Sequence, residues 1–134
     1  MTSKEYLKQY KNLSLKEEDT QAEVEHLERQ LNTYGNTQAY FTQHLQNEKA
    51  AAEAKLKENK AALKEIRKHI KKIDDYFLQD LLIYRYIDFL SWEEVTEALN
   101  TKYKPHSLNN VKQYSHNKAL ELLQNILDKE NLKQ

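Results

Sequence analysis

The side chains best suited to recognising another molecule lie between Thr101 and Lys118. This stretch contains no acidic residue, although the whole chain balances 21 basic against 21 acidic residues and has a formal net charge of zero. Its lysines and histidines are Lys102, Lys104, His106, Lys112, His116 and Lys118. The neutral total charge therefore conceals one locally basic surface. Because lysine ammonium groups pair with phosphates, this surface could contact a nucleic acid.

Amide side chains accompany these lysines, and together they predict contacts to double-stranded DNA. Asn and Gln can form two hydrogen bonds with adenine in the major groove, whereas Lys reaches guanine acceptors or backbone phosphates. The predicted contact residues are Lys102, Lys104, Ser107, Asn109, Asn110, Lys112, Gln113, His116 and Asn117. Solvation of a polar helix face would explain any one of them, but the acid-free block as a whole favours DNA as the partner.

Two helices are expected to position these side chains. The segment Ser91-Trp92-Glu93-Glu94 is a capping box, so a short helix should follow it to about Leu99. A polar connection with the single proline, Pro105, comes next, and Ser107 should cap a longer helix with His116 and the amides on its outer face. The inner face of that helix would be Leu108, Val111, Ser115, Ala119, Leu122 and Ile126. This order is that of a helix-turn-helix.

The N-terminal half predicts two long helices. The first should span about 3–32 and the second 38 to about 77, with a turn between them in which Gly35 is left-handed and Thr37 caps the second helix. Apolar residues recur at intervals of three and four along the second helix, which is typical of a coiled coil. So narrow a stripe must pack either against the first helix, as an antiparallel hairpin, or against another subunit.

The stripe supplies the predicted oligomerisation residues, which are Leu56, Asn59, Leu63, Ile66, Ile70 and Ile73. Asn59 has two interpretations: a solvated defect near the end of the coiled coil, or a polar residue that sets register and oligomeric state. We expect a homo-oligomer formed through the N-terminal helices. The expected fold is therefore all-α, with a long helical hairpin or coiled coil over residues 1–74 and a C-terminal helix-turn-helix DNA-binding domain over residues 75–134.

The composition argues against several other classes of protein. One glycine and one proline are too few for the turns of a β-sheet or for a glycine-rich phosphate loop. The absence of cysteine removes disulfides and thiolate zinc sites, and the histidines lack the spacing of a metal site. No nucleophile, base and orienting group occur together, so we expect neither an enzyme nor a cofactor. Without a long apolar run or a secretory signal, the chain should be cytoplasmic, with no membrane partner.

Two segments of the C-terminal half resemble patterns of a known family. They are Tyr84-Arg85-Tyr86-Ile87-Asp88-Phe89-Leu90-Ser91-Trp92-Glu93-Glu94-Val95 and His116-Asn117-Lys118-Ala119-Leu120-Glu121-Leu122-Leu123. They are similar to the R-Y-I-x-G-L-S-W-E-E-I and H-x-[RK]-A-L-x-x-L patterns of the RinA- and ArpU-like late transcriptional regulators of Gram-positive phages. The resemblance implies a sigma-factor-like helix-turn-helix, control of phage or mobile-element genes in a bacterial host, and contact with host RNA polymerase.

Two features depart from the pattern of that family. Phe89 stands where the family has glycine, so the turn there must form without a left-handed glycine or in a different geometry. The connection between Leu99 and Val111 is also longer than the tight turn of the family and contains Pro105. The longer connection could shift the recognition helix or act as a small wing.

Two further functions fit the same sequence. A small terminase subunit also joins a helix-turn-helix to a coiled-coil hairpin, and it would recognise phage DNA for packaging. A coiled-coil interaction adaptor would instead use the basic block to dock on another protein. The adaptor predicts no salt-dependent affinity for DNA, whereas the regulator and the terminase both predict it.

Overall fold

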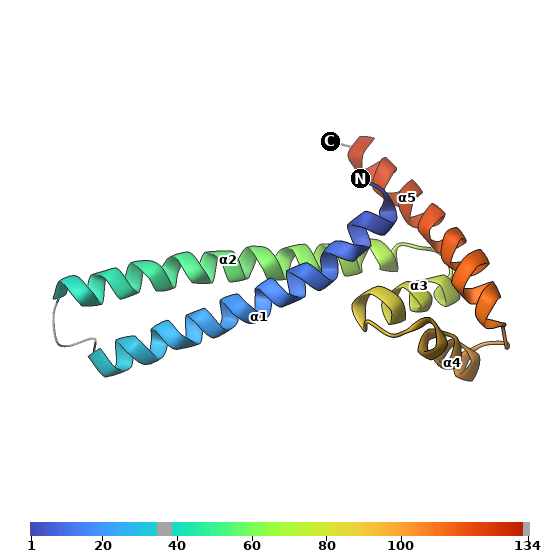
Figure 1. Ribbon diagram of the computed structural model, residues 1–134. Coiled ribbons are helices and arrows are strands. Elements are labelled where there is room, and N and C mark those ends of the chain that lie inside the picture. Colours follow the sequence, from blue (N-terminus) through green and yellow to red (C-terminus); the bar gives the residue numbers. More distant parts are fainter. Residues whose placement is uncertain (35–38, 133–134) are drawn as a thin grey trace. The chain divides into compact units, whose positions relative to one another are not determined.

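The computed structural model describes residues 1–34 and 39–132, and within these ranges the chain is all-helical, with no β-strand (Figure 1). The α-helices are α1 (Ser3–Tyr34), α2 (Ala39–Lys71), α3 (Tyr76–Leu82), α4 (Trp92–Lys102) and α5 (His116–Leu132). Two π-helical segments, η1 (Ile83–Ile87) and η2 (Asn110–Ser115), adjoin α3 and α5 respectively. The predicted turn at Gly35 and the predicted cap at Thr37 lie outside the described residues. No described helix has the length and apolar character needed to cross a membrane.

Packing divides the chain into two compact units. Residues Asn12–Leu63 form one unit, here called the hairpin, and Met1–Lys11 with Lys64–Gln134 form the other, here called the body. This division differs from the boundary between residues 74 and 75 that the sequence suggested. The first turns of α1 and the last turns of α2 belong to the body rather than to the hairpin. The assignment of separate functions to residues 1–74 and 75–134 remains a prediction.

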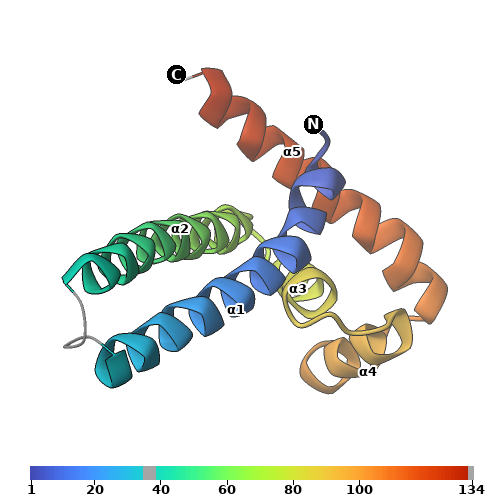
Figure 2. The same cartoon turned by 60° about the vertical axis from the view of Figure 1, so that its left-hand side comes forward.

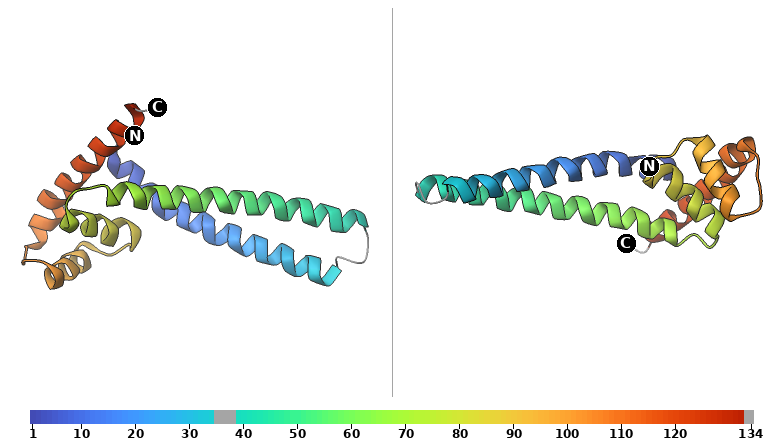
Figure 3. Two further views of the ribbon diagram at one scale, coloured as in Figure 1. Left: turned by 180° about the vertical axis from the view of Figure 1, so that it is seen from behind. Right: turned by 90° about the horizontal axis from the view of Figure 1, so that it is seen from below.

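Within the hairpin, the later part of α1 and the earlier part of α2 run antiparallel and side by side (Figures 1 and 3). Their buried core consists of Val24, Leu27, Leu45 and Ala52, with Leu31 and Leu56 packed against it. Since these residues recur every three or four positions, they lie on one face of each helix. The sequence allowed the apolar stripe of the second helix to pack against the first helix or against another subunit. In the hairpin it packs against the first helix of the same chain.

The second long helix ends earlier than the sequence suggested. The predicted helix over 38–77 is interrupted, because α2 ends at Lys71 and α3 begins at Tyr76. Asp75 has an extended backbone, and its carboxylate accepts a hydrogen bond from the Leu78 amide at 3.1 Å. This is the geometry of a helix N-cap, which satisfies an otherwise unpaired amide and starts a new helix direction.

The body buries side chains from every helix that it contains. Leu7 from α1, Ile70 from α2, Leu81 from α3, Leu99 from α4 and Leu123 from α5 are fully buried. Figure 2 shows the first turns of α1 beside α5. There the Ser3 hydroxyl donates a hydrogen bond to the Leu120 carbonyl at 2.8 Å. The start of the chain is thus part of the same core as α3, α4 and α5.

The turn between η1 and α4 has left-handed backbone at Phe89, with φ of 60°. This is the position at which the resembling family has glycine, so the left-handed turn is made here by a phenylalanine. A residue with a Cβ pays about 1 kcal/mol or more for this conformation. The ring centroids of Phe89 and Tyr10 lie 6.3 Å apart, a contact between the turn and α1 that offsets part of this cost.

Candidate nucleic-acid interface

The capping box predicted at the start of α4 is confirmed. The Ser91 hydroxyl accepts a hydrogen bond from the Glu94 amide at 3.2 Å, and the Glu94 carboxylate accepts one from the Ser91 amide at 3.0 Å. These hydrogen bonds lower the pKa of Glu94, because they favour its ionised form. The helix extends to Lys102 rather than ending near Leu99, so Lys102 belongs to the last turn of α4 and not to the connection.

The side chain of Asn100 bridges the connection after α4. The Asn100 side-chain oxygen accepts a hydrogen bond from the His106 amide at 2.9 Å, and the Asn100 side-chain nitrogen donates to the His106 carbonyl at 3.1 Å. The His106 and Phe77 rings are in contact, with centroids 4.7 Å apart. Although it is longer than a tight turn and contains Pro105, the connection therefore has a defined geometry that fixes where the next helix begins.

Ser107 caps that next helix, as predicted. Its hydroxyl accepts a hydrogen bond from the Asn110 amide at 3.1 Å, and its carbonyl accepts one from the Val111 amide at 3.0 Å. Helical backbone starts at Leu108 and continues through η2 into α5. We call Leu108–Ser115 with α5 the second helix.

The exposed side of the second helix carries most of the predicted contact residues. Five of them, all polar and all exposed, are Asn109, Asn110, Lys112, Gln113 and Asn117. Tyr114, which is 71% exposed, lies among them. No acidic residue occurs between Thr101 and Leu120, so the first turns of this face present amides, lysine and Tyr114 without a carboxylate.

His116 contradicts its predicted place on the outer face, because it is buried in the body with 7% of its surface exposed. The physical reason is the π-helical segment η2, which accommodates one extra residue in a turn and changes the phase of the residues that follow. Val111, Ser115 and Ala119 are buried as predicted, whereas Leu108, predicted on the inner face, is 37% exposed. Further along α5 the fully buried leucine is Leu123, and Leu122 is only partly buried. His116 is thereby turned towards the core.

The buried His116 is part of an aromatic cluster. Its Nε2 atom lies 2.7 Å from the Tyr86 hydroxyl, and its ring centroid lies 4.6 Å from that of Trp92. Burial lowers the pKa of His116 to about 4, and the positive charges of Lys4 and Arg85 act in the same direction. His116 is therefore neutral at physiological pH, and it acts as a packing residue beneath the exposed face.

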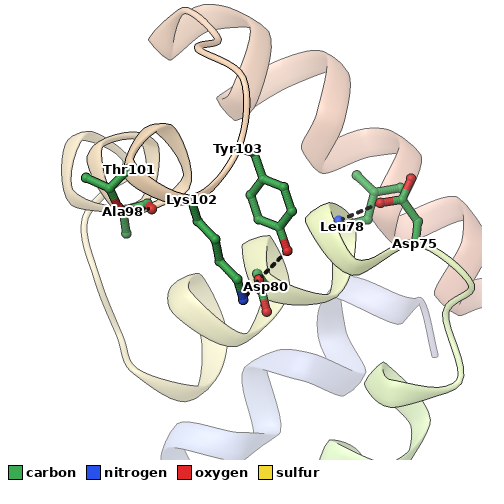
Figure 4. Close-up of polar contacts among 7 residues, drawn as sticks. All are labelled: Asp75, Leu78, Asp80, Ala98, Thr101, Lys102 and Tyr103. Atoms are coloured by element: carbon green, nitrogen blue, oxygen red, sulfur yellow. Dashed lines mark hydrogen bonds and ion pairs between the residues drawn. The ribbon is translucent and has the colours of Figure 1, made fainter.

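Lys102 at the end of α4 and Lys104 in the connection differ in their surroundings. Lys102 Nζ lies 2.8 Å from the Asp80 carboxylate, which also accepts a hydrogen bond from the Tyr103 hydroxyl at 2.6 Å (Figure 4). This contact raises the pKa of Lys102 and so favours its charged form, while the negative charge of Asp80 offsets part of the positive potential that Lys102 presents. Lys104 is exposed in the connection. Asp80 is 22 positions away from Lys102 on another helix, so no spacing in the sequence indicated this ion pair.

Three basic residues outside the predicted block lie near the second helix. Lys4, Lys8 and Arg85 line a hollow of about 280 Å³ together with Lys112 and Gln113. The sequence offered only one signal for them, the spacing of four between Lys4 and Lys8, which places both on one helix face. The candidate interface is therefore more basic than the block 101–118 alone.

The predicted oligomerisation residues are only partly available to another subunit. Leu63, Ile66, Ile70 and Ile73 are buried, with at most 4% of their surface exposed. Their apolar surface is thus covered within one chain, and a role of these four in oligomerisation remains a prediction. Leu56 is partly buried against the hairpin core, and Asn59 is partly exposed.

The described residues contain no group of three or more His, Asp or Glu side chains that could hold a metal ion. Comparison of the chain with models of known protein families, with curated proteins and with solved structures found no match.

Proposed function

We propose that this chain is a sequence-specific DNA-binding transcription regulator of phage or mobile-element genes. In this proposal α4 and the second helix form a helix-turn-helix, and the second helix enters the major groove. The observation that carries the proposal is the exposed, acid-free face of amides and lysine at the start of the second helix. Amides supply the paired donors and acceptors that adenine requires, and lysine supplies charge for guanine or phosphate.

The geometry of the preceding elements supports this use of the second helix. The Ser91 cap fixes the start of α4, the Asn100 side chain fixes the connection, and Ser107 fixes the start of the second helix. Side chains held on rigid elements can keep a constant register on the duplex. A helix whose first turns are displayed in this way suits base contacts, because recognition helices use their N-terminal residues.

The charges divide into two roles. Lys112 and Gln113 are adjacent and exposed, so they should read base edges, whereas Lys104 in the connection should contact backbone phosphate. Lys102 should contribute less to phosphate binding, because its ion pair with Asp80 offsets part of its positive charge. Two subunits would present their second helices to half-sites about one duplex turn apart. Such a dimer would need a surface other than the buried isoleucine stripe.

Selection from a pool of randomised duplexes tests the proposal. The purified full chain should enrich one sequence pattern at about 0.15 M salt, where weak surface attraction is largely screened. The double variant Lys112→Ala, Gln113→Ala should relax the preference at two or three base positions, and Lys104→Ala should weaken binding to all sequences alike. The matched control Gln46→Ala, Lys57→Ala removes the same side-chain types from exposed positions of α2 and should behave as wild type.

The other two functions predict different outcomes of this selection, of the same selection repeated with native genomic fragments, and of a measurement of oligomer size. A chain that enriches no pattern and shows no salt-dependent affinity for DNA would overturn the proposal in favour of the interaction adaptor. A ring-shaped assembly that binds beside packaging genes would instead support the small terminase subunit. An unchanged pattern with the Lys112 and Gln113 variant would show that the second helix does not read the bases.

A further inference from the structure

The hollow beside the second helix gathers four cationic side chains from three parts of the body. Lys4 and Lys8 come from the first turns of α1, Arg85 from η1 and Lys112 from η2. None of the ion pairs found in residues 1–34 and 39–132 involves these four side chains. No carboxylate lines the hollow. Four positive charges that line one hollow without a carboxylate among the lining residues favour the binding of an anion.

Several residues that line the hollow are held by contacts of their own. The Arg85 guanidinium lies 4.6 Å from the centroid of the Trp92 ring, and its Nη1 atom donates a hydrogen bond to the Leu90 carbonyl at 3.0 Å. The Tyr86 hydroxyl and His116 Nε2 are paired at 2.7 Å. Arg85 is therefore held in place by contacts that leave most of its five N–H donors available. A guanidinium held in this way next to lysine ammonium groups suits an oxyanion with several acceptor oxygens.

Electrostatics at His116 agree with this geometry. Its pKa is lowered chiefly by burial, and the charges of Lys4 and Arg85 lower it further. Those two charges, which come from α1 and η1, thus act on the same small region of the body. A neutral His116 adds no positive charge of its own, so the lysines and the arginine supply the attraction.

We propose that this hollow binds a phosphate group through Lys4, Lys8, Arg85 and Lys112. The phosphate could belong to the DNA backbone or to a small phosphorylated molecule, and the chemistry of recognition is the same for both. The inference does not rest on the proposed function, because a phosphate can be bound in the absence of DNA. If the source is DNA, the first turns of α1 join the second helix in one interface.

Trp92 allows a direct test, since it is the single tryptophan of the chain and lines the hollow. The full chain is titrated with inorganic phosphate at constant ionic strength, and tryptophan fluorescence is followed. We expect a saturable change. The variant Lys4→Ala, Lys8→Ala should raise the dissociation constant about tenfold or more, because each charge-assisted hydrogen bond is worth a factor of this size. Lys112→Ala alone should weaken binding as well.

The matched control is Lys64→Ala, Lys68→Ala. These lysines have the same spacing of four, are exposed on α2 within the body, and do not line the hollow. Their replacement should leave phosphate binding unchanged. The proposal is overturned if the response does not saturate, if acetate at equal ionic strength gives the same response, or if the Lys4 and Lys8 variant binds phosphate as tightly as the control.

A DNA titration then identifies the source of the phosphate. If it is the DNA backbone, the Lys4 and Lys8 variant should show a salt dependence of DNA binding that is smaller by about two phosphate contacts. If it is a small molecule, this variant should lose phosphate binding and keep the DNA salt dependence of wild type. Either result supports the phosphate site. Lys112 belongs to both proposals, so the sequence preference is also measured with Gln113→Ala alone, which keeps all four cations of the hollow. The phosphate titration of the Lys4 and Lys8 variant contains no DNA, so the two proposals can fail independently.

Discussion

The hairpin and the body are both helical, but they are stabilised to different degrees by buried side chains. The largest fully buried side chains all lie in the body: Leu7, Ile66, Ile70, Ile73, Leu81, Leu82, Leu99, Leu123, Val95 and Val111. The hairpin has a thin core of Val24, Leu27, Leu45 and Ala52. Since burial of apolar surface is the main source of stability, the body should be the rigid unit and the hairpin the more readily opened one.

The largest expected effect comes from core truncation in the body. Leu81→Ala should lower the free energy of unfolding by about 4 kcal/mol, because the cavity is enclosed on all sides, whereas Leu27→Ala in the hairpin should cost about 2 kcal/mol. Urea unfolding measures both values. Hydrogen exchange should show that Leu27→Ala reduces protection in the hairpin alone. Equal costs, or loss of protection throughout the chain with Leu27→Ala, would remove the distinction between the two units.

The next largest effect is a loss of folding stability at acidic pH. The pKa of His116 is about 4 in the folded chain and about 6.5 when exposed, so the unfolded state takes up a proton first as pH falls. This part of the stability is complete above pH 6.5 and is lost between pH 6.5 and 4, with a total of about 3 kcal/mol. Denaturant unfolding at a series of pH values measures it.

His116→Phe should remove most of this acid sensitivity, since it retains an aromatic ring without a titrating nitrogen. The exposed His44 of the hairpin provides the matched control, His44→Phe. An unchanged pH profile in His116→Phe would mean that the buried imidazole is not the source of the acid sensitivity.

The smallest expected effect is the difference in stability between alanine and glycine at one position in each unit. At Phe89, where φ is positive, Phe89→Gly should be more stable than Phe89→Ala by about 1 kcal/mol, because glycine adopts this backbone without steric cost. At the exposed Ala51 of α2, Ala51→Gly should reduce stability by about 1 kcal/mol. Thermal unfolding of these variants should therefore show opposite preferences. A preference for alanine at both positions would contradict the left-handed turn.

The sequence predicted those features that depend on neighbouring residues. The capping box at Ser91 and the cap at Ser107 are local motifs, because the donor and acceptor lie three positions apart, and both were located correctly. The break before α3 had a local signal too, since Asp75 could be recognised as an N-cap. Because the apolar pattern continues past this position, the sequence instead predicted one uninterrupted helix to about residue 77.

The missed features depend on distant residues or on irregular backbone. The ion pair of Lys102 with Asp80 and the contact of Ser3 with Leu120 join helices that are far apart in sequence, so no spacing rule indicates them. The burial of His116 follows from the π-helical segment η2, whereas sequence periodicity assumes regular turns. The exposure of the amides was therefore predicted correctly, and that of His116, the residue that follows the irregular turn, incorrectly.

The contact of Ser3 with α5 also bears on how the chain folds during synthesis. The Ser3 amide donates to the Gln124 side chain at 2.7 Å, and its hydroxyl donates to Leu120, so the two partners are separated by almost the whole sequence. The hairpin, in contrast, is made from residues 12–63 alone. Because long-range contacts can form only after both partners have left the ribosome, a nascent chain should carry a folded hairpin well before the body can close.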